Sequence, residues 1–139
     1  MSKPPSYVLD EQIGYVLRRV TQRHLALFSE AFPDLTAMQW AVLARLAQIG
    51  PLSQNLLGRE IAMDAATIKG VVDRLAREGL VSTSADPHDR RRLTVALTPD
   101  GAQIYAAGVT AALQVSEKTL APLGAEDRAL LLALLARLT

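Results

Sequence analysis

Apolar residues recur at helical spacing near both ends of the chain. From Leu9 to about Phe32 they follow the i, i+3, i+4 rhythm of one helix face, and His24 lies within that stripe. A last helix is predicted from Glu126 to Leu138, with leucine at positions 130, 131, 132, 134, 135 and 138. Six leucines cover more than one helix face, so they favour a homodimer that buries the excess. The alternative is one buried helix in a monomer core.

Helix-start signals divide the middle of the chain. Four segments begin with a side chain that can accept a hydrogen bond from the first turn, and the first of them also has a capping-box glutamine. These starts are Thr36 with Gln39, Ser53, Asp64 and Thr98 before Pro99, and the predicted helices cover about residues 37–49, 53–61, 65–78 and 99–120. Only about three residues join the second and third of these helices, which is typical of a helix-turn-helix.

The hydrophobic period changes after Gly79. Leu80–Ser84 and Leu93–Leu97 alternate between apolar and polar residues and predict two strands. The segment between them contains Asp86-Pro87, a turn signal, and then the consecutive arginines 90–92. A β-hairpin with a long basic tip is therefore expected directly after the helix-turn-helix.

This order of elements predicts a mainly α fold with a small β-hairpin, a winged helix-turn-helix with flanking dimerisation helices. The chain of 139 residues is expected to be a single domain. Its winged helix-turn-helix is expected at about residues 36–98, and its dimerisation helices at about 8–32 and 99–138.

Composition narrows the classes of function. Fifteen basic and 14 acidic residues exclude a strongly basic tail, and the absence of cysteine excludes thiol nucleophiles and thiolate metal sites. No phosphate-binding glycine loop or nucleophile elbow is visible, so we expect neither an enzyme nor a cofactor. The longest apolar run, Ala129–Ala136, is far shorter than the ~20 residues of a membrane span, and no apolar signal segment is visible near Met1. A cytoplasmic protein without a membrane partner is the expectation.

The predicted second helix of the helix-turn-helix supplies candidate DNA contacts. In this motif the N-terminal residues of that helix meet base edges in the major groove. Thr67 offers a hydroxyl and a methyl group to a base, while Lys69 and Arg74 reach phosphates. The candidates are Asp64, Ala66, Thr67, Lys69, Gly70 and Arg74, together with Ser53 and Gln54 at the start of the preceding helix. The alternative is an ordinary solvated helix face.

The hairpin tip supplies a second set. Arg90, Arg91 and Arg92 repel one another unless a polyanion is near, and a wing beside the recognition helix carries them to the adjacent minor groove. Asp89 lies two residues before Arg91, so we expect its carboxylate to orient that guanidinium. The alternative is a polar turn without a function in binding.

The run DPHDRRRLTVALT at residues 86–98, followed by Gly101, resembles the wing signature of the MarR (multiple-antibiotic-resistance regulator) family. Residues 67–81 and the helix start at residues 36–40 are also similar to that family. The resemblance implies a homodimeric DNA-binding regulator, usually a repressor, that a small phenolic or carboxylate ligand releases from DNA. Lys69-Gly70 departs from many members, so no operator sequence follows, and the lack of cysteine excludes the peroxide-sensing branch.

The first helix supplies candidate ligand contacts. Arg18, preferred slightly over Arg19, suits a carboxylate, His24 suits a hydroxyl, and apolar walls including Trp40 suit an aromatic ring. The segment from residue 7 through His24 also resembles family members that control aromatic-acid catabolism. A hydrogen-bonded core histidine is the alternative for His24. For the whole chain, the alternative function is a winged-helix protein-interaction module.

Overall fold

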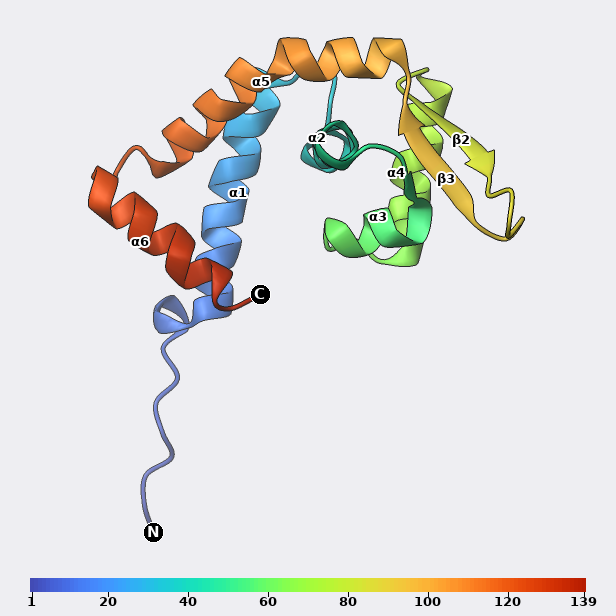
Figure 1. Ribbon diagram of the computed structural model, residues 1–139. Helices are drawn as coiled ribbons and strands as arrows, with labels where there is room; N and C mark the ends of the chain where they lie inside the picture. The colour runs from blue at the N-terminus through green and yellow to red at the C-terminus, as the bar shows by residue number, and fades with distance from the viewer.

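The computed structural model describes residues 1–139 and contains six α-helices and one small sheet. Figure 1 shows α5 as a long bridge, with α1 and α6 attached at one end and the other elements gathered toward the other end. The elements are a 3-10 turn Leu9–Glu11, α1 Ile13–Ala31, α2 Ala37–Ile49, β1 Leu52–Ser53, α3 Gln54–Glu60, α4 Ala65–Arg77, β2 Val81–Ala85, β3 Leu93–Leu97, α5 Pro99–Leu120 and α6 Ala125–Ala136. The predicted winged helix-turn-helix is confirmed.

The predicted helix starts are confirmed at atomic detail. Thr36 Oγ1 accepts a hydrogen bond from the Gln39 backbone N–H at 3.0 Å, and Gln39 Oε1 accepts from the Thr36 N–H at 2.9 Å. Ser53 and Thr98 each accept a hydrogen bond from the backbone N–H three residues later. Side-chain acceptors thus satisfy amide groups that a helix leaves unpaired at its N-terminus.

The sheet has one strand more than the predicted hairpin. β1 pairs antiparallel with β3, so the strand order is β1-β3-β2, with Leu52 opposite Val95. A two-residue strand is too short to produce an alternating pattern, so the sequence gives no sign of it. The first predicted helix also begins later, at Ile13, because the residues from Leu9 to Glu11 form a 3-10 turn.

A single aliphatic core holds α2, α3, α4 and the sheet together. We call these elements the winged-helix lobe. The core has nine buried residues, and all of them belong to this lobe: Val42, Leu43, Leu46, Leu57, Ile68, Val72, Leu75, Val81 and Val95. The lobe therefore hides its own apolar side chains.

The other helices, α1, α5 and α6, form what we call the helical arm. Few of its side chains are buried: Phe28 in α1 and Val115 in α5, while α6 has none. Apolar side chains are instead exposed along its surface, and Ile13 faces leucines of α6 across an open groove of about 360 Å³. No helix of the chain combines the length and the apolar character that crossing a membrane requires.

A row of aromatic rings joins the arm to the lobe. Phe28 stacks on Phe32, and Phe32 meets Trp40, which stacks on Tyr105 with ring centroids 5.2 Å apart. Gly108 of α5 lets Trp40 approach, because a Cβ added there would lie only 2.6 Å from the indole ring. The row fixes α2 against α5 and so sets how the lobe sits on the arm.

Candidate nucleic-acid interface and effector site

The N-terminus of α4 is fixed by Asp64. Its Oδ1 accepts a hydrogen bond from the Thr67 backbone N–H at 2.7 Å. Hydrogen bonds from the Thr67 backbone, then from its side chain, hold the pKa of the exposed Asp64 carboxyl below its ordinary value, and the Ala66 N–H adds to this. Asp64 thus acts as the helix cap, which makes it a positioning residue for the predicted contacts that follow it.

The outer face of α4 combines small side chains with paired charges. Ala66 and Gly70 are exposed, and nothing lies within 4 Å of the position of a Cβ on Gly70. Lys69 pairs with Asp73 at 2.7 Å, and Arg74 pairs with Glu78 at 3.4 Å. All four charged side chains of these i,i+4 pairs are well exposed, so the pairs add little to stability and can exchange partners at little cost.

Two aspartates shape the backbone of the wing tip. Asp86 Oδ1 accepts from the His88 N–H at 2.8 Å, and Asp89 Oδ1 accepts from the Arg91 N–H at 3.0 Å. The expectation that the Asp89 carboxylate holds the Arg91 guanidinium is wrong, because the two side chains form no ion pair and the carboxylate closes a local turn on the backbone. The guanidinium groups of the three arginines 90–92 form no ion pair within the chain and are exposed to solvent.

The start of α3 lies beside the arginines of the wing tip. A small polar cavity of about 50 Å³ brings Ser53 and Gln54 together with Arg91 and Arg92. The Oε1 atom of Gln54, one of its lining residues, is buried and has no hydrogen-bond partner. Four of the predicted DNA-contacting residues are therefore neighbours, although nearly 40 positions separate the two pairs in the sequence.

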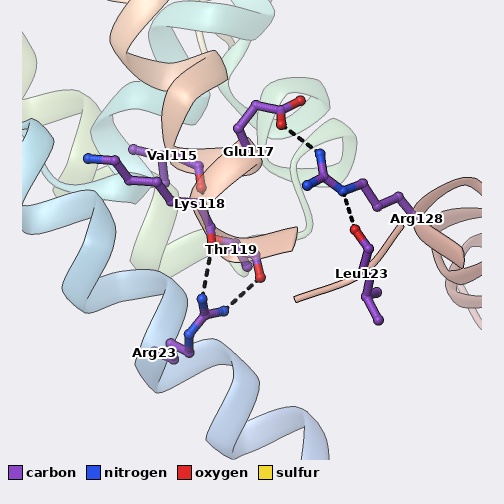
Figure 2. Close-up of polar contacts among 7 residues, drawn as sticks. All are labelled: Arg23, Val115, Glu117, Lys118, Thr119, Leu123 and Arg128. Carbon is purple, nitrogen blue, oxygen red and sulfur yellow. Dashed lines mark hydrogen bonds and ion pairs between the residues drawn. The ribbon is translucent and has the colours of Figure 1, made fainter. Parts of the chain in front are cut away.

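The far end of α5 is fastened to α1, as Figure 2 shows. Arg23 donates to the carbonyl oxygens of Thr119 at 2.6 Å and Lys118 at 2.8 Å. Beside it, His24 Nδ1 lies 2.8 Å from the Thr119 hydroxyl oxygen. Sequence reasoning missed Arg23, because its partners are 95 and 96 positions away. A cation that faces the last carbonyls of a helix is a recognised way to end it.

The three predicted effector contacts are distributed over two helices. Arg18 is exposed and forms no hydrogen bond or ion pair within the chain, whereas Arg19 lies over the Tyr15 ring at 5.9 Å. Trp40 meets α5 at Gly108 and His24 meets it at Thr119. These α5 positions are eleven residues apart, about 16 Å along a helix. Within one chain the three side chains are therefore not gathered around one small cavity.

Two hollows flank α2. The larger, of about 640 Å³, lies between the end of α1, the start of α2 and the recognition helix, with Phe28, Met38 and Arg74 among its walls. The other, of about 250 Å³, is lined mostly by apolar side chains of α2 and α5, including Trp40 and Tyr105. Both have the mixed apolar and polar walls that suit a small organic ligand.

Comparison with known proteins identifies the family. The MarR family model matches residues 35–93, which span α2 to the start of β3. NicR, an HTH-type transcriptional repressor of Pseudomonas putida, is 41% identical over 134 residues, covering 95% of this chain and 85% of NicR. This chain belongs to the MarR family. It is accordingly a transcriptional regulator and not an enzyme.

Solved structures of MarR regulators are similar to nearly the whole chain. BpsR of Bordetella bronchiseptica, whose DNA binding is regulated by 6-hydroxynicotinic acid, has a TM-score of 0.91 and 38% identity, with 96% of this chain and 97% of BpsR covered. PcaV of Streptomyces coelicolor, solved in complex with its natural ligand, has a TM-score of 0.90 and 31% identity, with 97% and 96% covered. The arrangement of lobe and arm is thus shared with regulators that respond to ligands.

Proposed function

We propose that this MarR-family chain is a homodimeric repressor that binds a pseudo-palindromic operator and that a small aromatic acid releases it. The observation that carries the DNA-binding part is the wing tip. Its three exposed guanidinium groups have no acidic partner, and the hairpin that carries them follows the recognition helix α4. Such an arrangement needs a polyanion to offset the repulsion among its charges.

The exposed apolar surface of the arm supports the homodimer. Leu130 and Leu132 of α6, Leu138 just after it and Leu113 of α5 each expose more than half of their surface in one chain. A two-fold interface formed by α1, α5 and α6 covers these side chains. It also sets two recognition helices about 34 Å apart, which is one turn of DNA.

On the operator, each α4 enters a major groove with the Ala66, Thr67 and Gly70 face toward the bases. Lys69 and Arg74 exchange their intrachain partners for phosphates, and Ser53 and Gln54 contact the backbone at the start of α3. Arg90–Arg92 enter the flanking minor groove. Counterion release then gives a slope of about −0.9 in log K against log salt for each phosphate neutralised.

The effector part is supported by two relatives and by the arginines of α1. BpsR responds to 6-hydroxynicotinic acid, and PcaV has a natural small ligand. Arg19 and Arg23 are engaged with Tyr15 and with α5, so Arg18 is the α1 arginine that is free to bind a carboxylate. We assign Arg18 and His24 to the polar groups of the acid, between the dimer helices and the winged-helix lobe. Trp40, predicted as an apolar wall, contacts α5 about 16 Å from the His24 contact, so within one chain it does not line the same small site. The acid releases DNA because it favours a subunit spacing that does not fit adjacent major grooves.

A fluorescence-anisotropy titration tests the proposal. The purified protein is titrated against DNA from upstream of its own gene, with and without benzoate, hydroxybenzoates and hydroxynicotinates. We expect tight, salt-sensitive binding that one of these acids relieves. Binding that no acid relieves would remove the effector part, and no specific binding at low salt would favour a winged-helix interaction module.

Two matched variants then locate the acid. Arg18→Ala is expected to keep DNA binding and to lose most of the response to the acid, because a charged hydrogen bond to the carboxylate is lost. Arg19→Ala, at the neighbouring position, keeps both. An Arg18→Ala variant with the full response would exclude Arg18 from the effector site.

A further inference from the structure

The His24 side chain takes part in a chain of two hydrogen bonds at the end of α5. Its Nδ1 lies 2.8 Å from Thr119 Oγ1, and that oxygen lies 2.9 Å from the backbone carbonyl oxygen of Val115. Arg23, the neighbouring residue in α1, binds two carbonyl groups of the same α5 turn. The imidazole is therefore held in one orientation relative to the Thr119 hydroxyl, next to the Arg23 contacts that Figure 2 shows.

Counting the protons available to these two hydrogen bonds decides which ring nitrogen of a neutral His24 carries hydrogen. The Thr119 hydroxyl has one proton, and Val115 O is an acceptor only. A threonine within a helix commonly donates this proton to the carbonyl four residues earlier. The 2.8 Å contact with the ring is then a hydrogen bond only if Nδ1 carries a proton and donates it to Oγ1. The opposite assignment leaves two acceptor oxygens 2.9 Å apart without a proton between them.

A proton on Nδ1 leaves the second ring nitrogen with its lone pair. Nε2 points to the other side of the ring, away from Thr119, and forms no hydrogen bond within the chain. A neutral His24 therefore presents an acceptor at its free edge. An acceptor pairs with the O–H of a hydroxylated ring and not with a carboxylate, which has no proton to give.

We propose that Thr119 is a specificity-determining positioning residue: it fixes the Nδ1–H form of His24, so that Nε2 accepts a hydrogen bond from a ring hydroxyl of the effector. The inference rests on the proposed function, in which His24 contacts the aromatic acid. The two side chains then have different roles: Arg18 binds the carboxylate, and His24 discriminates hydroxylated acids from acids without a hydroxyl. Loss of one such hydrogen bond weakens binding by about tenfold.

The tautomer is measured first, without any ligand. Full-length protein labelled with ¹⁵N-histidine is studied by long-range ¹H–¹⁵N correlation at a pH where imidazoles are neutral, and His88→Gln assigns the signals because the chain has two histidines. The wild type and Thr119→Ser should show His24 protonated at Nδ1. Thr119→Val, which keeps the branched shape but removes the hydroxyl, should lose this form. A wild-type His24 protonated at Nε2, or a Thr119→Val spectrum like that of the wild type, would overturn the inference.

A second experiment compares the binding of benzoate with that of the three hydroxybenzoate isomers by calorimetry on the same variants. We expect the wild type and Thr119→Ser to prefer one hydroxybenzoate over benzoate by about tenfold, and Thr119→Val to bind both about equally. If the tautomer is as assigned but the preference survives in Thr119→Val, the specificity role of Thr119 is wrong and the proposed function stands. If no acid binds the wild type, the effector part of the proposed function fails, and this inference fails with it.

Discussion

The winged-helix lobe and the helical arm bury their apolar residues in different ways. All nine residues of the main core lie between Val42 and Val95, inside the lobe. In the arm, α6 has no buried residue, although its sequence is rich in leucine. The lobe buries its hydrophobic core within one chain, whereas the arm exposes apolar surface that a second copy of the chain can bury.

This difference separates two contributions to stability. Burial in the lobe does not depend on protein concentration. Burial at an interface between copies follows mass action, so the arm gains stability as the chain is concentrated. Substitutions in the two regions should therefore affect different measurements, and the following experiments test this from the largest effect to the smallest.

The largest effect is expected from charges on α6. Leu130 and Leu134 are four residues apart, on one helix face, and are 56% and 45% exposed. The double change of Leu130→Glu and Leu134→Glu should prevent dimer formation, which sedimentation measures directly. Operator affinity should fall by about 10²–10⁴, because the two half-sites are then bound independently. Ile49→Glu is the matched control, since Ile49 is 51% exposed but belongs to the lobe. A double variant that remains a dimer would contradict the assignment of the dimer interface to the arm.

The converse test removes a side chain from the lobe core. Leu57 is fully buried in α3, so Leu57→Ala should lower the free energy of unfolding by about 2–5 kcal/mol in urea titrations. Leu56→Ala, at the adjacent position, should cost less, because Leu56 is already 38% exposed. The Leu57→Ala chain should remain a dimer at high concentration, and its dissociation would show that the two regions are coupled.

At the wing, Arg91→Ala should weaken operator binding by about 1–3 kcal/mol. The slope of log K against log salt should become shallower by about 0.9, as for one phosphate contact. Arg91→Lys keeps the charge and so should keep the salt slope while losing part of the affinity. Equal binding by wild type and Arg91→Ala at equal salt would exclude the wing from the interface.

The smallest effect concerns the cap of α4. The pKa of Asp64 is lowered in the folded chain relative to its ordinary value of 3.8. The unfolded chain therefore binds the proton more tightly, so the stabilisation is present above that value and is lost as the pH falls through the folded pKa.

Asp64→Asn, which also caps helices, should remove this pH dependence and keep most of the stability at neutral pH. Asp64→Ala should lower stability at neutral pH as well. Thermal melts across the acid range distinguish the three proteins, and parallel pH profiles for the wild type and Asp64→Asn would rule out the charge of Asp64 as the cause.

Sequence reasoning predicted the lobe well because its signals are local. Each helix start, such as Thr36 with Gln39, forms hydrogen bonds to residues three positions away. The failures involve partners that are distant or ambiguous. β1 exists only because β3 lies beside it, and Arg23 finds its acceptors in Lys118 and Thr119.

The candidate site shows the same limit. The sequence placed Asp89 near Arg91, but an aspartate can bond either a guanidinium or a backbone N–H, and spacing does not choose between them. For His24, the helical pattern indicated its face, but the role of Thr119 required the contact itself. Helix periodicity tells where a side chain points, and only the packed structure tells what it meets.

Finally, α5 starts at the wing and ends where Arg23 and His24 of α1 contact Lys118 and Thr119. Strand β3 ends at Leu97 and α5 starts at Pro99, with the Thr98 hydroxyl donating to the Gly79 carbonyl at their junction. The 22 residues of α5 make a helix about 33 Å long along its curved axis, which Figure 1 shows, with no flexible linker at the wing end. A continuous helix transmits a tilt along its length: a tilt of a few degrees where α5 contacts His24 and Arg23 displaces the wing by ~2–3 Å, about the length of a hydrogen bond.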